Sequence, residues 1–199
     1  MIGGLYDTIN MASGLTWARA GNAARVLRSF YRSRRTQLPV MNGMPVSMSI
    51  EPTTSCNLRC PECPSGLRSF TRPTGMLDPS LFRQVMDDVG STLSYLTFYF
   101  QGEPYLHSSF LGMVEYAAAK GIYTATSTNA HFLSEQVAQH TVRSGLDRLI
   151  ISIDGTTQET YQSYRIGGSL DKVLRGARNI IAAKKALRSK TPCVVFQFW

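Results

Sequence analysis

At 199 residues and 43% hydrophobic composition, the chain is long enough to bury the core of one domain and too apolar for a disordered or fibrous protein. Its net charge of +8 indicates a basic surface but does not by itself identify a partner. The N-terminal segment lacks the pattern of a signal peptide, and no uninterrupted apolar stretch reaches about 18 residues. We therefore expect a cytoplasmic protein without a transmembrane segment.

Much of the positive charge lies near the N-terminus. Six arginines stand against one acid, Asp7, within residues 1–38, which gives +5 of the net +8. We interpret residues 1–40 as a basic helical appendage with a helix over 14–35, and residues 41–199 as the main domain. The arginines form either a solvated outer face or a contact with a polyanion or a membrane surface. No motif for nucleic-acid binding is evident.

Beyond the appendage, β-prone stretches alternate with amphipathic helical stretches. The predicted strands are 46–51, 93–100, 122–127, 148–153 and 193–199. The predicted helices are 78–90, 109–120, 134–145, 158–164 and a longer one after Gly168. Asp78, Ser134 and Ser169 are the predicted N-caps of three of them. This alternation implies right-handed βαβ units and a parallel sheet. The prediction is an α/β fold, a partial (β/α)6 TIM-like barrel truncated after its fifth strand.

The apolar spacing also predicts which helical side chains face the sheet. In the first helix after the cysteines these are Leu81, Phe82, Val85, Met86 and Val89. In the last helix they are Leu170, Val173, Leu174, Ala177, Ile180 and Ile181. Residues 65–75 show no periodicity, so we expect them to extend the preceding loop without regular structure.

Three thiols, Cys56, Cys60 and Cys63, lie in the loop after the first predicted strand. Their tight spacing offers soft ligands that suit iron or zinc, and clustered thiols of this kind indicate metal binding rather than disulfides. Three ligands leave one position of a tetrahedral metal, or one iron of a cubane cluster, without a protein ligand. A closed structural zinc site would need a fourth ligand. The candidates for that ligand are Glu62, His107 and Cys193.

Polar residues follow the ends of the next predicted strands. Gly102-Glu103-Pro104 comes after the second strand, Asn129 after the third, and Ser152 and Asp154 at the end of the fourth. Sites of α/β barrels form at the C-terminal ends of the strands. We therefore expect these residues and the cysteine loop to meet on one rim.

This combination resembles the radical S-adenosylmethionine (SAM) superfamily over residues 46–199. In that family the three cysteines bind three irons of a [4Fe-4S] cluster, and the amine and carboxylate of SAM chelate the fourth. Iron–sulfur potentials reach about −700 mV, low enough to suit reduction of a sulfonium. The resemblance implies reductive cleavage of SAM to a 5′-deoxyadenosyl radical that abstracts hydrogen from a substrate. It also implies a reducing partner such as flavodoxin or ferredoxin.

The resemblance assigns roles to individual residues. Gly102, Glu103 and Pro104 match the motif that contacts the methionine amine, and a carboxylate suits an N–H donor. Arg165 matches the arginine that pairs with the methionine carboxylate, a planar fork on a planar anion.

The remaining assignments concern the nucleoside. Ser152 and Asp154 match a Ser-x-Asp near the ribose and carboxylate of SAM, and Asn129 matches a ribose contact. Val195, on the fifth strand, matches a position beneath the adenine.

The chain departs from the family pattern at three positions. Glu62 stands where an aromatic residue is common, and Gln101 and Ala130 each stand where a glycine is common. The nearest resemblance is to members that modify peptides or proteins and carry a C-terminal SPASM-type extension with auxiliary clusters, a part absent here. No helix or sixth strand follows the apolar fifth strand to cover its exposed edge, so we expect the chain to be a piece of a longer protein. The alternative function is a non-catalytic iron–sulfur or zinc protein that transfers electrons or folds around its metal.

Overall fold

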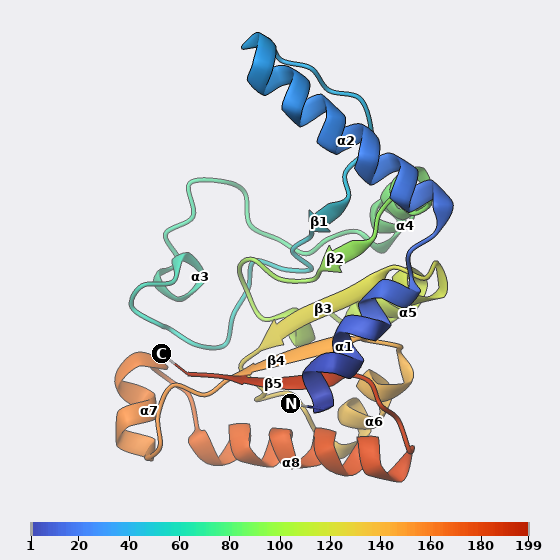
Figure 1. Ribbon diagram of the computed structural model, residues 1–199. Helices are drawn as coiled ribbons and strands as arrows, with labels where there is room; N and C mark the ends of the chain where they lie inside the picture. Colours follow the sequence, from blue (N-terminus) through green and yellow to red (C-terminus); the bar gives the residue numbers. More distant parts are fainter. Residues whose placement is uncertain (1, 199) are drawn as a thin grey trace.

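The computed structural model describes residues 2–198 and contains one five-stranded parallel sheet (Figure 1). Neighbouring strands pair in chain order, and the sheet does not close into a ring. The strands are β1 (Ser47–Ser49), β2 (Tyr95–Thr97), β3 (Tyr123–Thr128), β4 (Arg148–Ser152) and β5 (Cys193–Gln197). The predicted α/β class and partial TIM-like barrel are confirmed.

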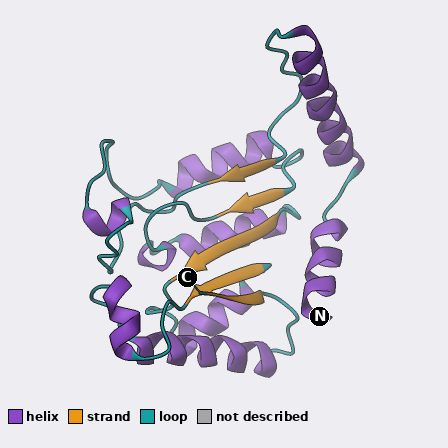
Figure 2. Ribbon diagram, turned by 60° about the vertical axis from the view of Figure 1, so that its left-hand side comes forward, coloured by secondary structure: helices purple, strands orange, loops and turns teal. Residues whose placement is uncertain are grey.

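Four helices cover one face of the sheet (Figure 2): α4 (Pro79–Val89), α5 (Phe110–Ala119), α6 (Glu135–Arg143) and α8 (Leu170–Ala186). Three of them begin at predicted caps, because the side chains of Asp78, Ser134 and Ser169 accept hydrogen bonds from backbone N–H groups of the first turn. The shorter helices are α3 (Pro64–Leu67), η1 (Pro104–Leu106) and α7 (Gln158–Tyr164). The prediction placed α7 at its observed bounds and did not foresee α3.

The hydrophobic core fills the space between the sheet and these helices. Alternate residues of β2 and β4 point into it, among them Leu96 and Leu149, and both are fully buried. Three predicted inward residues instead face solvent: Leu81, Leu174 and Ile181. Each lies next in sequence to a buried position, and one residue along a helix turns the side chain by about 100° out of the apolar stripe.

The strands β1 and β2 are shorter than predicted. Each has three residues in the ladder, because the chain diverges soon afterwards into the loops of the rim. Single hydrogen bonds extend the pairing: Ile50 N–H donates to Thr97, and Phe98 N–H donates to Ala125. The apolar pattern therefore predicted which segments enter the sheet but overestimated the length of regular pairing.

The N-terminal helix α1 (Ile2–Ser13) lies against the end of the sheet opposite to the rim (Figure 1). Asp7 of α1 is buried, pairs with Arg148 and accepts a hydrogen bond from the Tyr123 hydroxyl. The sequence analysis did not predict α1, since its stability comes from these contacts with the sheet rather than from a local helical signal.

The second helix, α2 (Trp17–Thr36), corresponds to the predicted helix 14–35 but begins three residues later, and it projects away from the sheet (Figures 1 and 2). Its base is fixed by the buried Arg19, which donates to the backbone carbonyls of Gly14, Gly90, Lys120 and Gly121. The division of the chain at residue 40 stays a prediction. Within residues 2–198, the helices lack the length and hydropathy needed to span a membrane.

Candidate active site at the C-terminal ends of the strands

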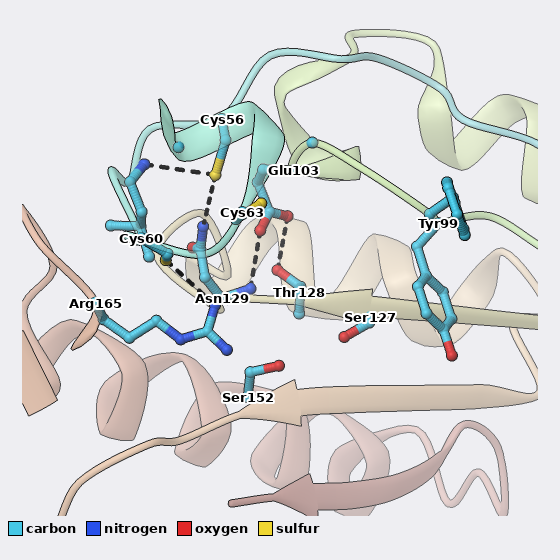
Figure 3. Close-up of a pocket in the computed structure, with 14 residues that line it drawn as sticks. Cys56, Cys60, Cys63, Tyr99, Glu103, Ser127, Thr128, Asn129, Ser152 and Arg165 are labelled. Carbon is cyan, nitrogen blue, oxygen red and sulfur yellow. Dashed lines mark hydrogen bonds between the residues drawn. The ribbon is translucent and has the colours of Figure 1, made fainter. Parts of the chain in front are cut away.

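A cavity of about 130 Å³ lies at the C-terminal ends of β2, β3 and β4, beneath the cysteine loop (Figure 3). The predicted rim thus forms a single site. Eight predicted site residues line it: Cys56, Cys60, Cys63, Gly102, Glu103, Asn129, Ser152 and Arg165. Three others, Pro104, Asp154 and Val195, do not line it.

The cysteine loop, residues 56–63, is held in place by packing and by backbone contacts. Leu58 is fully buried, and the N–H of Arg59 donates to the carbonyl of Ile166 at 2.9 Å. Gly66 lies so close to the backbone of Cys60 that a Cβ at this position would collide with it. The loop therefore folds against both α3 and the segment after α7.

Two of the three thiols, Cys56 and Cys60, face hydrogen-bond donors. Cys56 Sγ lies 3.5 Å from the backbone nitrogen of Leu58 and 3.9 Å from Nδ2 of Asn129. Cys60 Sγ lies 3.8 Å from Nη1 of Arg165 (Figure 3). Donors and a cation around sulfur favour thiolate ligands, which fits an iron–sulfur cluster.

Burial counteracts these donors in the metal-free chain. It raises the pKa of Cys56 to about 11 and also raises the pKa of Cys60. Cys56 and Cys60 are therefore protonated near neutral pH, and a metal that binds their sulfurs must displace these protons. Within the part of the chain that the structure describes, no three His, Cys, Asp or Glu side chains meet closely enough to hold one metal ion. The thiols instead surround the cavity.

The three candidates for a fourth zinc ligand lie away from the cavity lining. Glu62 is exposed on the loop. His107 contacts the carbonyl of Leu77 through Nε2, and its Nδ1 accepts the N–H of Ser109, so its role is local. Cys193 begins β5 and pairs in register with Arg148 at the opposite end of the sheet.

Glu103 is a buried hydrogen-bond acceptor of the site, and both of its carboxylate oxygens have donors. Its side chain is 2% exposed and accepts hydrogen bonds from Thr128 Oγ1 at 2.7 Å and from the Asn129 backbone nitrogen at 2.8 Å. Burial raises the pKa of Glu103 to about 7. Gly102 makes the turn possible, because its φ of 80° favours glycine and a Cβ there would collide with the Thr53 carbonyl.

Arg165 reaches the cavity from the C-cap of α7. Its Nε donates to Oδ2 of Asp154, whose side chain is buried after β4. This ion pair directs the guanidinium toward Cys60. The structure thus shows Asp154 holding Arg165 in position, while the predicted contact of Asp154 with a cofactor stays a prediction.

The other two predicted residues outside the lining differ from each other. Pro104 is buried in η1 directly behind Glu103, where it shapes the loop. Val195 is 39% exposed on β5. Their predicted contacts with SAM remain predictions.

Further lining residues were missed by the sequence analysis. Tyr99, within the predicted strand 93–100, is half-buried and lines the cavity, whereas its neighbour Phe98 is buried in the core. Ser127 and Thr128 also line it. Strand alternation would have indicated Tyr99 and Ser127, since they lie on the strand faces opposite to the core.

Gln101 and Ala130 stand where the family commonly has glycine, and the structure shows what each residue does there. Oε1 of Gln101 lies 3.3 Å from both Cys63 Sγ and Ser65 Oγ, so this residue contacts a predicted metal ligand. Ala130 has a φ of 60°, a left-handed conformation that explains why glycine suits the position.

Comparison with known proteins decides the family. Residues 50–196 match the Radical SAM superfamily. The chain belongs to this superfamily. The cofactors of this family are a [4Fe-4S] cluster and SAM, and the thiols and donors of the cavity fit them.

Two curated relatives illustrate the similarity of this radical SAM chain. It is 27% identical over 137 residues to the AdoMet-dependent heme synthase of Methanosarcina barkeri, covering 68% of this chain and 39% of that protein. It is 30% identical over 139 residues to the mycofactocin maturase MftC of Mycobacterium tuberculosis, covering 70% of this chain and 35% of that protein. The chain therefore spans well under half the length of these relatives.

Among solved structures, native anSMEcpe with bound AdoMet is similar, with a TM-score of 0.62 and 22% identity. The similarity covers 77% of this chain and 43% of that one. At this identity the match shows the fold, which agrees with the open parallel sheet described above.

Proposed function

We propose that this chain is the catalytic core of a radical SAM enzyme. The carrying observation is that three thiols, a buried carboxylate and an arginine line one cavity at the C-terminal ends of the strands. In the proposed assignment, Cys56, Cys60 and Cys63 hold the cluster. When bound, the cluster and SAM supply a 5′-deoxyadenosyl radical that abstracts hydrogen from the substrate.

The protein side chains position the reactants in this proposal. Glu103 accepts the amine N–H of SAM, because its oxygens are already fixed by Thr128 and Asn129. Arg165 pairs with the methionine carboxylate, and Ser152 contacts the nucleoside from the end of β4. The cysteine loop lies above the cavity and limits the access of water to the radical.

A peptide or protein side chain is the proposed substrate. MftC is named a maturase, and structures similar to this chain are described as anSMEcpe with AdoMet and the Cp18Cys peptide and as SuiB bound to the precursor peptide SuiA. A flavodoxin or ferredoxin supplies the electron, and the reaction takes place in the cytoplasm.

Anaerobic reconstitution with iron and sulfide tests the proposal. We expect about four irons per chain, a change of the cluster spectrum when SAM is added, and 5′-deoxyadenosine after reduction. One tightly bound zinc, or a cluster whose spectrum ignores SAM, would contradict the proposal and favour the non-catalytic metal protein.

A further inference from the structure

The N-terminal arm, defined as residues 17–46, carries an unusual charge distribution. Six arginines and no acid or lysine occur between residues 8 and 50. Arg19 is buried at the base of α2, and the other five arginines are exposed. No carboxylate occurs within this segment, so the positive charge of the six arginines is not balanced by acidic side chains on the same helix.

Four of these residues form an arginine stripe along α2. They follow each other at intervals of three, four and three, which places them on one side of an α-helix. The stripe consists of Arg25, Arg28, Arg32 and Arg35. None of the salt bridges found among the described residues involves any of them.

The arm also exposes an apolar patch on another side of α2 and on the segment that returns to β1. The exposed fraction is 56% for Phe30 and 91% for Met41. The patch consists of Val26, Leu27, Phe30, Tyr31, Leu38, Met41 and Met44. Between the helix and the returning segment lies an open hollow of about 370 Å³, lined by Val26, Phe30 and Met41 among others. Isolated exposed apolar residues are ordinary on a protein surface, but a contiguous patch of this kind indicates a binding surface.

The arm projects from the rest of the molecule (Figures 1 and 2), so an extended flat surface can contact it without meeting the sheet. It projects beyond the sheet (Figures 1 and 2), and its base contacts Gly90, Lys120 and Gly121, which precede β2 and β3 at the end opposite to the cavity. A contact on the arm would therefore leave the catalytic rim open. This inference does not depend on the proposed reaction.

We propose that the arm binds the surface of a membrane that contains anionic phospholipids. The arginine stripe provides attraction to the lipid phosphates and carboxylates, at about 1 kcal/mol for each arginine near the surface. The apolar patch provides aromatic and aliphatic side chains that enter the boundary between headgroups and acyl chains. A nucleic acid would use the arginines and leave the apolar patch in water, so the membrane accounts for both features.

Vesicle binding of the full chain tests the proposal. Co-sedimentation is measured with vesicles of phosphatidylcholine alone and with vesicles that also contain phosphatidylserine, at low and at high salt. We expect binding only to the anionic vesicles, weakened by salt. The Arg28→Gln/Arg32→Gln variant should bind about 30-fold more weakly, the effect of two charges at about 1 kcal/mol each. Phe30→Ser should weaken binding by about tenfold through the loss of apolar burial.

A control with the same change of net charge is available on another helix. Arg175 and Arg178 are exposed on α8, and the Arg175→Gln/Arg178→Gln variant should bind as the unchanged protein does. Equal losses in both double variants, equal binding to neutral and anionic vesicles, or no binding at all would overturn the proposal. So would a dimer that forms without lipid and that Phe30→Ser abolishes. The salt dependence needs no variant, so the proposal stays testable if a substitution impairs folding.

Discussion

The two walls of the cavity are held in different ways. On the strand side, Glu103 is buried and accepts hydrogen bonds of 2.7 and 2.8 Å from Thr128 and Asn129 at the end of β3. On the loop side, the sulfurs of Cys56 and Cys60 have only contacts of 3.5 to 3.9 Å with nitrogen donors. No strand runs through the cysteine loop.

This difference indicates when each wall acquires its working geometry. The proposed acceptor for the SAM amine, Glu103, is fixed by the fold, because its hydrogen bonds connect adjacent strand ends. On the loop side, Cys56 and Cys60 are protonated because burial raises their pKa, and they have only long contacts with nitrogen donors, so we expect metal binding to complete their arrangement. Substitution of a loop thiol should therefore abolish metal binding. Substitutions on the strand side should instead change the stability of the fold and its dependence on pH.

The largest expected effect follows removal of a loop thiol. Cys60→Ala should abolish cluster assembly, because two thiolates no longer suffice to hold a cubane at this loop. The measurement is iron and sulfide per chain after anaerobic reconstitution. Cys193→Ala is the control and should retain the full iron content, since Cys193 lies on β5 outside the cavity. Loss of iron in the control would mean that a fourth cysteine closes the site.

The second prediction concerns Gly102, which joins the two walls. In Gly102→Ala, the new Cβ collides with the Thr53 carbonyl, and the residue must keep a φ near 80°. We expect a loss of about 2–4 kcal/mol in the free energy of unfolding, from backbone strain and overpacking. Urea denaturation measures it.

Gly112 provides the matched control for this substitution. It lies within α5 with no atom near the position of an added Cβ, so Gly112→Ala should be neutral or stabilise the protein by about 1 kcal/mol. Equal destabilisation by both substitutions would show that the contact with Thr53 is not what makes Gly102 necessary.

The third prediction concerns the pH dependence that Glu103 contributes in the metal-free chain. Its pKa rises from 4.5 to about 7 on folding, so the folded state binds the proton more tightly. The stabilisation is complete below pH 4.5 and is lost as pH rises through 7, by up to about 3 kcal/mol. Urea denaturation across this range should show the fall, and Glu103→Gln should remove it.

An exposed carboxylate controls for general charge effects on this profile. Glu159 is exposed on α7, and Glu159→Gln should keep the slope of the unchanged protein. A profile that stays equally steep in Glu103→Gln would show that other groups cause it.

Much of the fold was readable from the sequence because its signals are local. Apolar periodicity located the five strands and the helices α4 to α8 but not the short α3 and η1, and the caps Asp78, Ser134 and Ser169 gave the starts of three helices. Helix α1 was missed because Asp7 acts through Arg148 and Tyr123, more than 110 residues away in sequence. A contact of that range leaves no periodic signal in its own segment.

The site was readable to the extent that its residues follow strand ends. Eight of the eleven named residues line one cavity, since parallel strands bring their C-terminal ends together. The partnership of Asp154 with Arg165 could not be read, because it depends on the path of the chain around α7. The role of Tyr99 was obscured by its position in an aromatic strand, where only alternation separates the two faces.

The smallest expected effect lies where the two walls touch, at Gln101. Its amide is 3.3 Å from Cys63 Sγ, and once Cys63 is a thiolate, the amide N–H can turn toward the sulfur and donate a hydrogen bond. Hydrogen bonds to ligand sulfurs help to set cluster potentials, and a donor stabilises the more negative, reduced state. Gln101→Leu should therefore retain its iron but shift the midpoint potential to more negative values, as measured by a redox titration followed by electron paramagnetic resonance. Gln136→Leu, on the exposed side of α6, should leave the potential unchanged. An unshifted potential in Gln101→Leu would restrict Gln101 to its contact with Ser65, and the donors left to the sulfurs would be the backbone of Leu58 and the side chains of Asn129 and Arg165.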